Sequence, residues 1–170
     1  HRGPDGEGVW IQGSTGLACQ LLRVTPEATT ETQPLGHVSG AVLVFDGRLD
    51  NREELLASLT ASPGISPESP DPALVLAAYE AFGERFAERL NGDFALGLFD
   101  PNRRRLLLAR DALGIRPLYY ARPRDTFLFA SEIKALLAHP DVSARPNNDV
   151  LAEFVLDLPR NDQGLTFFDG

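Results

Sequence analysis

The chain has 170 residues, 43% of them hydrophobic, which predicts one globular domain over residues 1–170 whose core needs neither disulfides nor metals. Its formal net charge of −8 argues against nucleic acid and anionic membranes as partners, because both require a concentrated basic face. No apolar stretch approaches the roughly 18 residues that cross a bilayer. The single cysteine, Cys19, cannot form an internal disulfide, which favours the reducing cytoplasm.

Short apolar runs in the first part of the chain predict β-strands at 9–11, 17–24 and 41–45. Glycines or turn residues bound each of these runs. The third run closes at Asp46-Gly47, a pair that is typical of a tight turn between strands. We therefore expect the chain to begin as β structure.

Two helical patterns follow these strands. Leucines at helical spacing within 51–60 predict an amphipathic helix that is capped by Asp50 or Asn51. From 71 to 90, apolar residues recur at steps of three and four, which predicts a second helix that breaks at Gly83. A proline-rich loop joins the two patterns.

Three further apolar runs, each too short for a helix, predict one antiparallel meander. The runs are 90–100, 106–120 and 129–134, and the turn signals between or beside them lie at 100–103, 111–117 and 122–125.

Two more helices are predicted near the end of the sequence. Ser131 is expected to cap a helix that ends at Leu137, and Asn147 or Asn148 to cap another that ends at Leu156. Strands in hairpin-linked groups, with helices between the groups, favour the α+β class with helices outside antiparallel sheets.

Two segments of this sequence, His1-Arg-Gly-Pro-Asp-Gly6 and the block from Asn91 to Lys134, resemble the class II, N-terminal-nucleophile glutamine amidotransferase domain of asparagine synthetase. The resemblance extends over nearly the whole chain. It implies a four-layer αββα sandwich of two antiparallel sheets, as in N-terminal-nucleophile hydrolases. It also implies a C-terminal synthetase domain that uses ATP and Mg²⁺, whereas this domain needs no cofactor. The partners it implies are glutamine for a working domain, the synthetase domain of the same chain and a second copy of the protein.

The family's nucleophile is an N-terminal cysteine, which lies a few tens of residues before the His-Arg-Gly-Pro-Asp segment and uses its own α-amine as the base. This chain begins at His1 and has no methionine, so we expect either a truncated front end or a processed product, and a native frame that continues beyond Gly170. Cys19 lies in an apolar strand and is expected to be buried and structural. No residue here is assigned as catalytic, and the scattered histidines and cysteine predict no metal site.

The resemblance identifies the positions that would form the glutamine pocket. They are Leu21, Leu22, Arg23, Val24, Asp46, Gly47, Arg48 and Asp71.

Several of these positions differ from the family in charge. Leu21 stands where the family has an arginine that clamps the substrate's α-carboxylate, and strand alternation places Arg23 about 7 Å away, too far to replace it. Asp46 stands where an asparagine donates an N–H to the oxyanion, a charge that a carboxylate repels. Arg48 replaces the glutamate that receives the substrate's ammonium, while Asp71 matches the aspartate that shares this role.

The sequence therefore predicts the glutaminase-like domain of an asparagine synthetase-related, ATP-dependent amide-forming protein, with a degenerate glutamine site. One alternative is a working amidotransferase that supplies ammonia and whose nucleophile lies outside this sequence. Another is a stand-alone, non-catalytic binding module. Arg110, Asp111 and Glu132 are expected to shape turns at element boundaries rather than to form a buried ion pair near the pocket.

Overall fold

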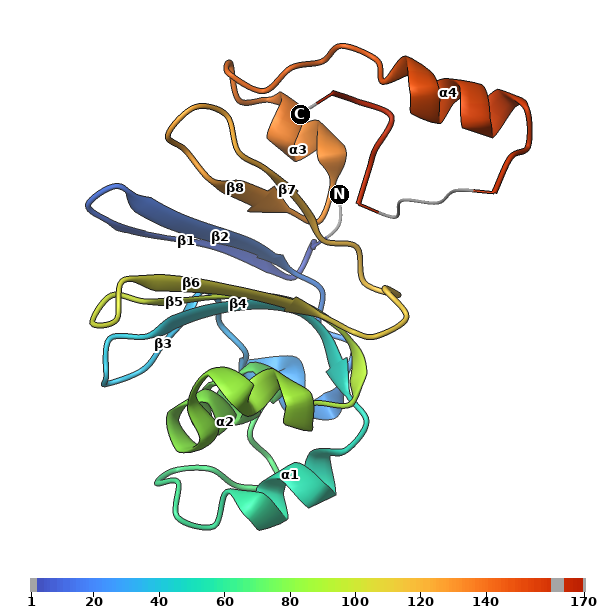
Figure 1. Cartoon of the computed structure of the whole chain (residues 1–170). Helices are drawn as coiled ribbons and strands as arrows, with labels where there is room; N and C mark the ends of the chain where they lie inside the picture. Colours follow the sequence, from blue (N-terminus) through green and yellow to red (C-terminus); the bar gives the residue numbers. More distant parts are fainter. Residues whose placement is uncertain (1–2, 160–163, 170) are drawn as a thin grey trace. The chain divides into compact units, whose positions relative to one another are not determined.

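The chain divides into two units, residues 1–117 and 118–170. The computed structural model describes residues 3–159 and 164–169, so His1 and Arg2 of the predicted first turn lie outside the described residues. Helices and antiparallel strands are both present, which confirms the α+β class (Figure 1).

Within its described residues, 3–117, the first unit contains six strands, two α-helices and two 3₁₀ segments. They are β1 (Gly6–Gln12), β2 (Thr15–Leu21), η1 (Pro26–Thr30), β3 (Leu35–Gly36), β4 (Val42–Leu49), α1 (Arg52–Ser58), α2 (Asp71–Phe82), η2 (Gly83–Arg89), β5 (Gly92–Asp100) and β6 (Arg105–Arg110).

A four-stranded antiparallel sheet, in the order β3-β4-β5-β6, organises this unit. Its longest pairing joins β4 to β5, from Val42 opposite Phe99 to Leu49 opposite Gly92. Because side chains alternate along a strand, one face presents the fully buried Leu43, Phe45, Leu96 and Leu98 to α1, α2 and η2. Burial of these large side chains is the main stabilising contribution to the unit.

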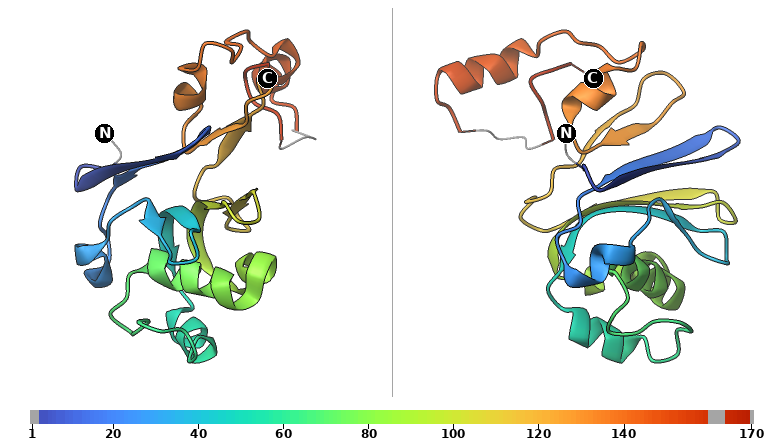
Figure 2. Two further views of the ribbon diagram at one scale, coloured as in Figure 1. Left: turned by 90° about the vertical axis from the view of Figure 1, so that its left-hand side faces the viewer. Right: turned by 180° about the vertical axis from the view of Figure 1, so that it is seen from behind.

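The opposite face of this sheet is covered by the β1-β2 hairpin. The Trp10 ring on β1 lies 5.9 Å from the Phe99 ring on β5, measured between centroids. Figures 1 and 2 show the hairpin and the helices α1 and α2 on opposite sides of the sheet. The first unit thus has helix, sheet and sheet layers, and the second sheet layer carries the segment that leads into the predicted pocket.

Two strand predictions in this unit need correction. The strand predicted at 17–24 ends at Leu21, because its partner strand β1 begins at Gly6, the residue opposite Leu21. Beyond this end, the Arg23 N–H donates to the Asp5 carboxylate at 2.8 Å. Asp46-Gly47 is not a turn but lies within β4. Gly47 has φ 151°, and a Cβ there would lie 2.1 Å from the Asp93 carbonyl oxygen, so a glycine lets two strands approach closely.

The predicted helices of the first unit are confirmed, including the break at Gly83. Asn51 precedes α1, but its side chain makes no capping bond. It donates instead to the Arg89 carbonyl at 2.9 Å and accepts from the Asn91 N–H at 3.0 Å. None of the helices in the described ranges is long and apolar enough to span a membrane.

The second unit contains the hairpin β7 (Tyr119–Ala121) and β8 (Leu128–Ala130), followed by α3 (Ile133–Leu137) and α4 (Asn148–Val155). The single predicted meander is wrong, because β5 pairs with β6 and β7 with β8, with no ladder between β6 and β7 in the described chain. Ser131 is not a cap, since Glu132 precedes α3. Asn147 does cap α4, where its side chain accepts the Val150 N–H at 3.2 Å.

Candidate functional site

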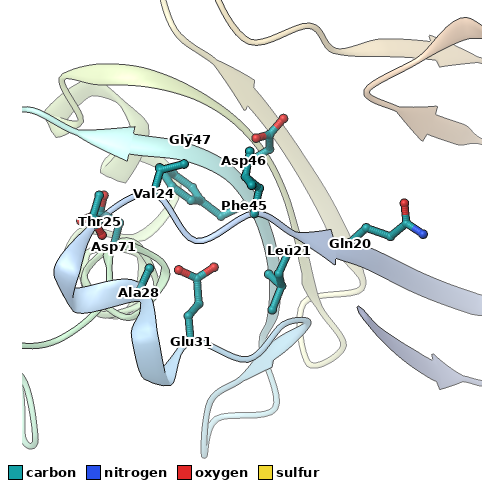
Figure 3. A pocket seen from close by; sticks show the side chains of 11 residues that line it. Gln20, Leu21, Val24, Thr25, Ala28, Glu31, Phe45, Asp46, Gly47 and Asp71 are labelled. Carbon is teal, nitrogen blue, oxygen red and sulfur yellow. The ribbon is translucent and has the colours of Figure 1, made fainter. Parts of the chain in front are cut away.

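A pocket opens in the first unit where the end of β2 faces β4 and the start of α2 (Figure 3). Its volume is about 30 Å³, room for on the order of two water molecules. Its lining residues are Gln20, Leu21, Leu22, Val24, Thr25, Ala28, Glu31, Phe45, Asp46, Gly47 and Asp71. Six of the eight predicted positions therefore meet here, while Arg23 and Arg48 do not line the pocket.

The carboxylate-clamp position is an apolar wall. Leu21 is buried at the end of β2, opposite Gly6, and its side chain has no hydrogen-bond donor. Leu22 and Val24, which follow it, are both more than half exposed. This side of the pocket has an apolar character that suits a hydrocarbon surface better than a carboxylate.

Arg23 does not replace the clamp, and the structure explains why. Its Nη1 donates to the Asp5 carbonyl at 2.5 Å, and its Nη2 donates to the Glu31 carbonyl at 2.9 Å. Strand alternation does not govern the direction of this side chain, because β2 ends at Leu21. Its guanidinium thus links the backbone at Asp5 to the backbone at Glu31.

Glu31 is a pocket residue that sequence reasoning did not find. Its carboxylate points toward the middle of the lining residues (Figure 3) and accepts from Gln33 Nε2 at 2.6 Å. Gln33 is itself buried and hydrogen-bonded to the N–H and carbonyl of Phe45. Burial raises the pKa of Glu31. No periodicity marks this residue, because only the tertiary path of η1 brings it to the end of β2.

The two charged positions on β4 have partners within the protein. Asp46 lies 3.3 Å from the Nη1 atom of Arg116. Arg48 is more than half exposed, with its Nε 3.4 Å from Asp50 and its Nη2 3.7 Å from Asp93, its neighbour across the sheet. The inverted charge of Arg48 is therefore directed at carboxylates outside the pocket.

Asp71, the retained family carboxylate, is 4% exposed and has a protein partner on each oxygen. Oδ2 accepts the Leu49 N–H at 2.8 Å, and Oδ1 is paired with Arg52. The same guanidinium donates through Nη2 to the carbonyls of Pro67 and Ser69, at 2.9 and 2.8 Å. Asp71 thus joins β4, α1 and the loop before α2.

Cys19 has the properties of a structural thiol. It is half-buried rather than fully buried as predicted. Burial, and then the negative charges of Glu31 and Asp46, raise the pKa of its thiol to about 11. Since the thiolate is the nucleophilic form, this residue is a poor nucleophile at neutral pH.

The Asp111 turn lies in the first unit and supports the expected scaffold role. The Asp111 carboxylate accepts the N–H groups of Leu113, Ile115 and Arg116 at 2.9–3.1 Å. These hydrogen bonds lower the pKa of Asp111, and the one from the Arg116 N–H has the largest effect. The Arg110 guanidinium packs beside Gly114, where an added Cβ would lie 3.3 Å from its Cζ. In the second unit, Glu132 pairs with Lys134 at 2.7 Å.

His37, Ser39 and Glu80 form a polar cluster that lacks the arrangement of a catalytic triad. Ser39 Oγ and Glu80 Oε1 lie 3.0 and 3.2 Å from the same His37 nitrogen, Nδ1, and the Ser39 hydroxyl donates to Glu80 at 2.5 Å. A catalytic triad instead places the nucleophile and the acid on opposite imidazole nitrogens. Within residues 3–159 and 164–169, no three potential ligands gather to hold a metal.

Known proteins resemble this chain over most of its length. The profile of a family described as "Glutamine amidotransferase domain" matches residues 1–169. Asparagine synthetase [glutamine-hydrolyzing] 3 of Bacillus subtilis is 33% identical over 172 aligned residues, which cover 99% of this chain and 28% of that protein. Amidase chry2 of Gibberella zeae is 36% identical over 141 residues, which cover 81% of this chain and 21% of that protein.

Among solved structures, the glutamine phosphoribosylpyrophosphate amidotransferase of B. subtilis, complexed with ADP and GMP, matches with a TM-score of 0.56 and 22% identity. The match covers 71% of this chain and 28% of that chain. It shows a shared fold, that of the N-terminal-nucleophile hydrolases. The present chain spans less than a third of the length of each of these relatives.

Proposed function

This chain belongs to the glutamine amidotransferase domain family of asparagine synthetase type, and we propose that it is a member whose pocket no longer hydrolyses glutamine. The observation that carries the proposal is the buried Leu21 at the position of the carboxylate clamp. A substrate carboxylate at this wall would lose its hydration without gaining a charged donor. The loss of such a partner costs a few kcal/mol of binding free energy.

The pocket also opposes the transition state of amide hydrolysis. The ionised Asp46 can only accept hydrogen bonds and repels an oxyanion, even though Arg116 offsets part of its charge. The replacement of one oxyanion donor alone lowers the rate on the order of a hundredfold. Binding and catalysis are therefore weakened by two separate substitutions.

We further propose that the native protein is longer and that this domain is a folded partner of a C-terminal synthetase domain in the cytoplasm. There, a carboxylate would be activated with ATP and Mg²⁺ and then converted to an amide. The names of the two curated relatives, an asparagine synthetase and an amidase, support this assignment. Release of AMP and pyrophosphate by the full-length protein, tested across carboxylate and amine pairs, would identify its substrates.

A working glutaminase is the second candidate, because the family profile matches residues 1–169 and Asp71 is retained. Its nucleophile would lie in a segment that precedes the present sequence. Ammonia supply would then be its activity in the parent protein.

One experiment separates the two candidates. An N-terminal Cys-Gly segment with the family's first strand is placed ahead of His1, and glutamate and ammonia formation are measured. We expect no appreciable hydrolysis from this protein, and recovery after the triple change Leu21→Arg, Asp46→Asn and Arg48→Glu. Hydrolysis near a normal amidotransferase rate with the pocket unchanged would contradict the degenerate site and support the working glutaminase.

A further inference from the structure

Three oxygen atoms from one stretch of the chain, residues 67–71, converge on the guanidinium of Arg52. They are Oδ1 of Asp71 and the carbonyl oxygens of Pro67 and Ser69. One guanidinium nitrogen faces the carboxylate and another faces both carbonyls, which is the forked geometry that distinguishes arginine from lysine. The side chains of Arg52 and Asp71 are 19% and 5% exposed, so the pair is largely removed from water.

The guanidinium of Arg85 has different surroundings. Arg85 pairs with Glu88, but their side chains are 82% and 61% exposed and no backbone carbonyl joins them. Exposed pairs of this kind contribute little, because water solvates both partners equally well. The Arg52 pair differs in its burial and in its additional acceptors.

We infer that Asp71, Pro67 and Ser69 form a binding site for a guanidinium-type organic cation, which Arg52 fills from within the chain. The effect of this site on ligand binding in the pocket rests on the proposed function. In that function, Asp71 matches the aspartate that would receive a substrate's ammonium. In this structure the negative charge of Asp71 is paired with Arg52, and its Oδ2 atom accepts the Leu49 N–H. Arg52 is therefore the residue that withdraws the retained carboxylate from ligand binding.

Chemical rescue tests this inference directly. The Arg52→Ala variant removes the internal cation and leaves the three acceptors in place. We expect methylguanidinium to bind there and raise the Tm of this variant by about 3–6 °C at ten times its dissociation constant. Sodium chloride at equal ionic strength, and methylammonium, which lacks the planar fork, should raise it less.

Two matched variants serve as controls. Arg85→Ala removes an exposed guanidinium, and its Tm should not respond to methylguanidinium. The double variant Arg52→Ala/Asp71→Asn lacks the anionic acceptor, and it should lose the rescue. If Arg52→Ala does not fold, the same cations are compared by the yield of its refolding.

The outcomes separate this inference from the proposed function. Absence of rescue in Arg52→Ala, or equal rescue in the double variant, would overturn the cation site and leave the loss of glutaminase activity untouched. Glutamine hydrolysis by the cysteine-restored protein with its pocket unchanged would contradict the proposed function, and methylguanidinium rescue would still establish the site.

Discussion

The Asp111 turn and the pocket both contain carboxylates with partners inside the protein, but the partners differ in kind. Asp111 is bonded to backbone N–H groups, whose positions the path of the chain determines. In the pocket, Asp46 and Asp71 are paired with the arginine side chains of Arg116 and Arg52. A carboxylate that accepts backbone N–H groups is needed wherever the turn exists. A carboxylate that binds a ligand can acquire an internal partner once the ligand is lost.

The largest expected effect tests whether Asp71 has become structural. The Asp71→Ala change leaves Arg52 and the Leu49 N–H without their partner in a largely buried place, which should lower the free energy of unfolding by about 3 kcal/mol. Urea denaturation measures this loss. Glu88→Ala, which removes an exposed partner of Arg85, is the matched control and should leave the urea midpoint unchanged. An equally small effect at Asp71 would contradict a structural role for this carboxylate.

A second test concerns the reactivity of Cys19. With its pKa raised from an ordinary 9.0 to about 11, its thiolate fraction at pH 7 is about a hundredfold lower than that of an ordinary thiol. We expect labelling by a maleimide reagent to be slower than in the urea-unfolded chain by about this factor. Glutamine analogues should not change the rate. Fast labelling that glutamine blocks would assign a nucleophile to the pocket.

A smaller effect is expected at Asp111. The Asp111→Ala change removes the acceptor of three backbone N–H groups and should lower the Tm by roughly 5 °C. Asp111→Asn, which keeps one acceptor oxygen, should lose less.

The same residue predicts a dependence on pH. Because the folded pKa of Asp111 is lowered, its contribution is complete above the ordinary carboxyl pKa near 4 and is lost as the pH falls through the folded value. The Asp111→Asn variant should therefore lose less stability than the unmodified chain between about pH 5 and pH 2. Parallel acid titrations of the two proteins would contradict this assignment.

The smallest effect is expected for Asp46→Asn. Asp46 and Arg116 have side chains that are 38% and 29% exposed, and water screens their attraction. The free energy of unfolding should change by less than about 1 kcal/mol, as measured by urea denaturation. A much larger loss would place Asp46 with Asp71 among the structural carboxylates.

The sequence predicted those features of the fold that depend on local periodicity and chemistry. The helices over 51–60 and 71–90, the break at Gly83 and the cap at Asn147 are all present. The split of the meander was not predicted, because the turn signal at 111–117 does not indicate whether the strands on either side of it pair with each other.

For the candidate site, resemblance located positions but not their partners. Leu21, Asp46 and Asp71 do line one pocket. The role of Arg52 could not be predicted, since its acceptors lie 15 to 19 residues further along the chain and reach it only through the fold of the proline-rich loop. Glu31 was not predicted either, because it reaches the pocket only through the path of the chain after η1.

The close approach of β4 and β5 has a consequence for how this pocket can change during evolution. A Cβ on Gly47 would lie 2.1 Å from the Asp93 carbonyl oxygen, and one on Gly92 would lie 2.2 Å from the Arg48 carbonyl oxygen. Mutation of either glycine forces the strands apart, whereas the exposed side chains of Arg48 and Asp93 between them are free to vary. Charges beside the pocket can therefore be exchanged one substitution at a time on an unchanged backbone, so that the electrostatic field around the pocket can change without an unfolded intermediate.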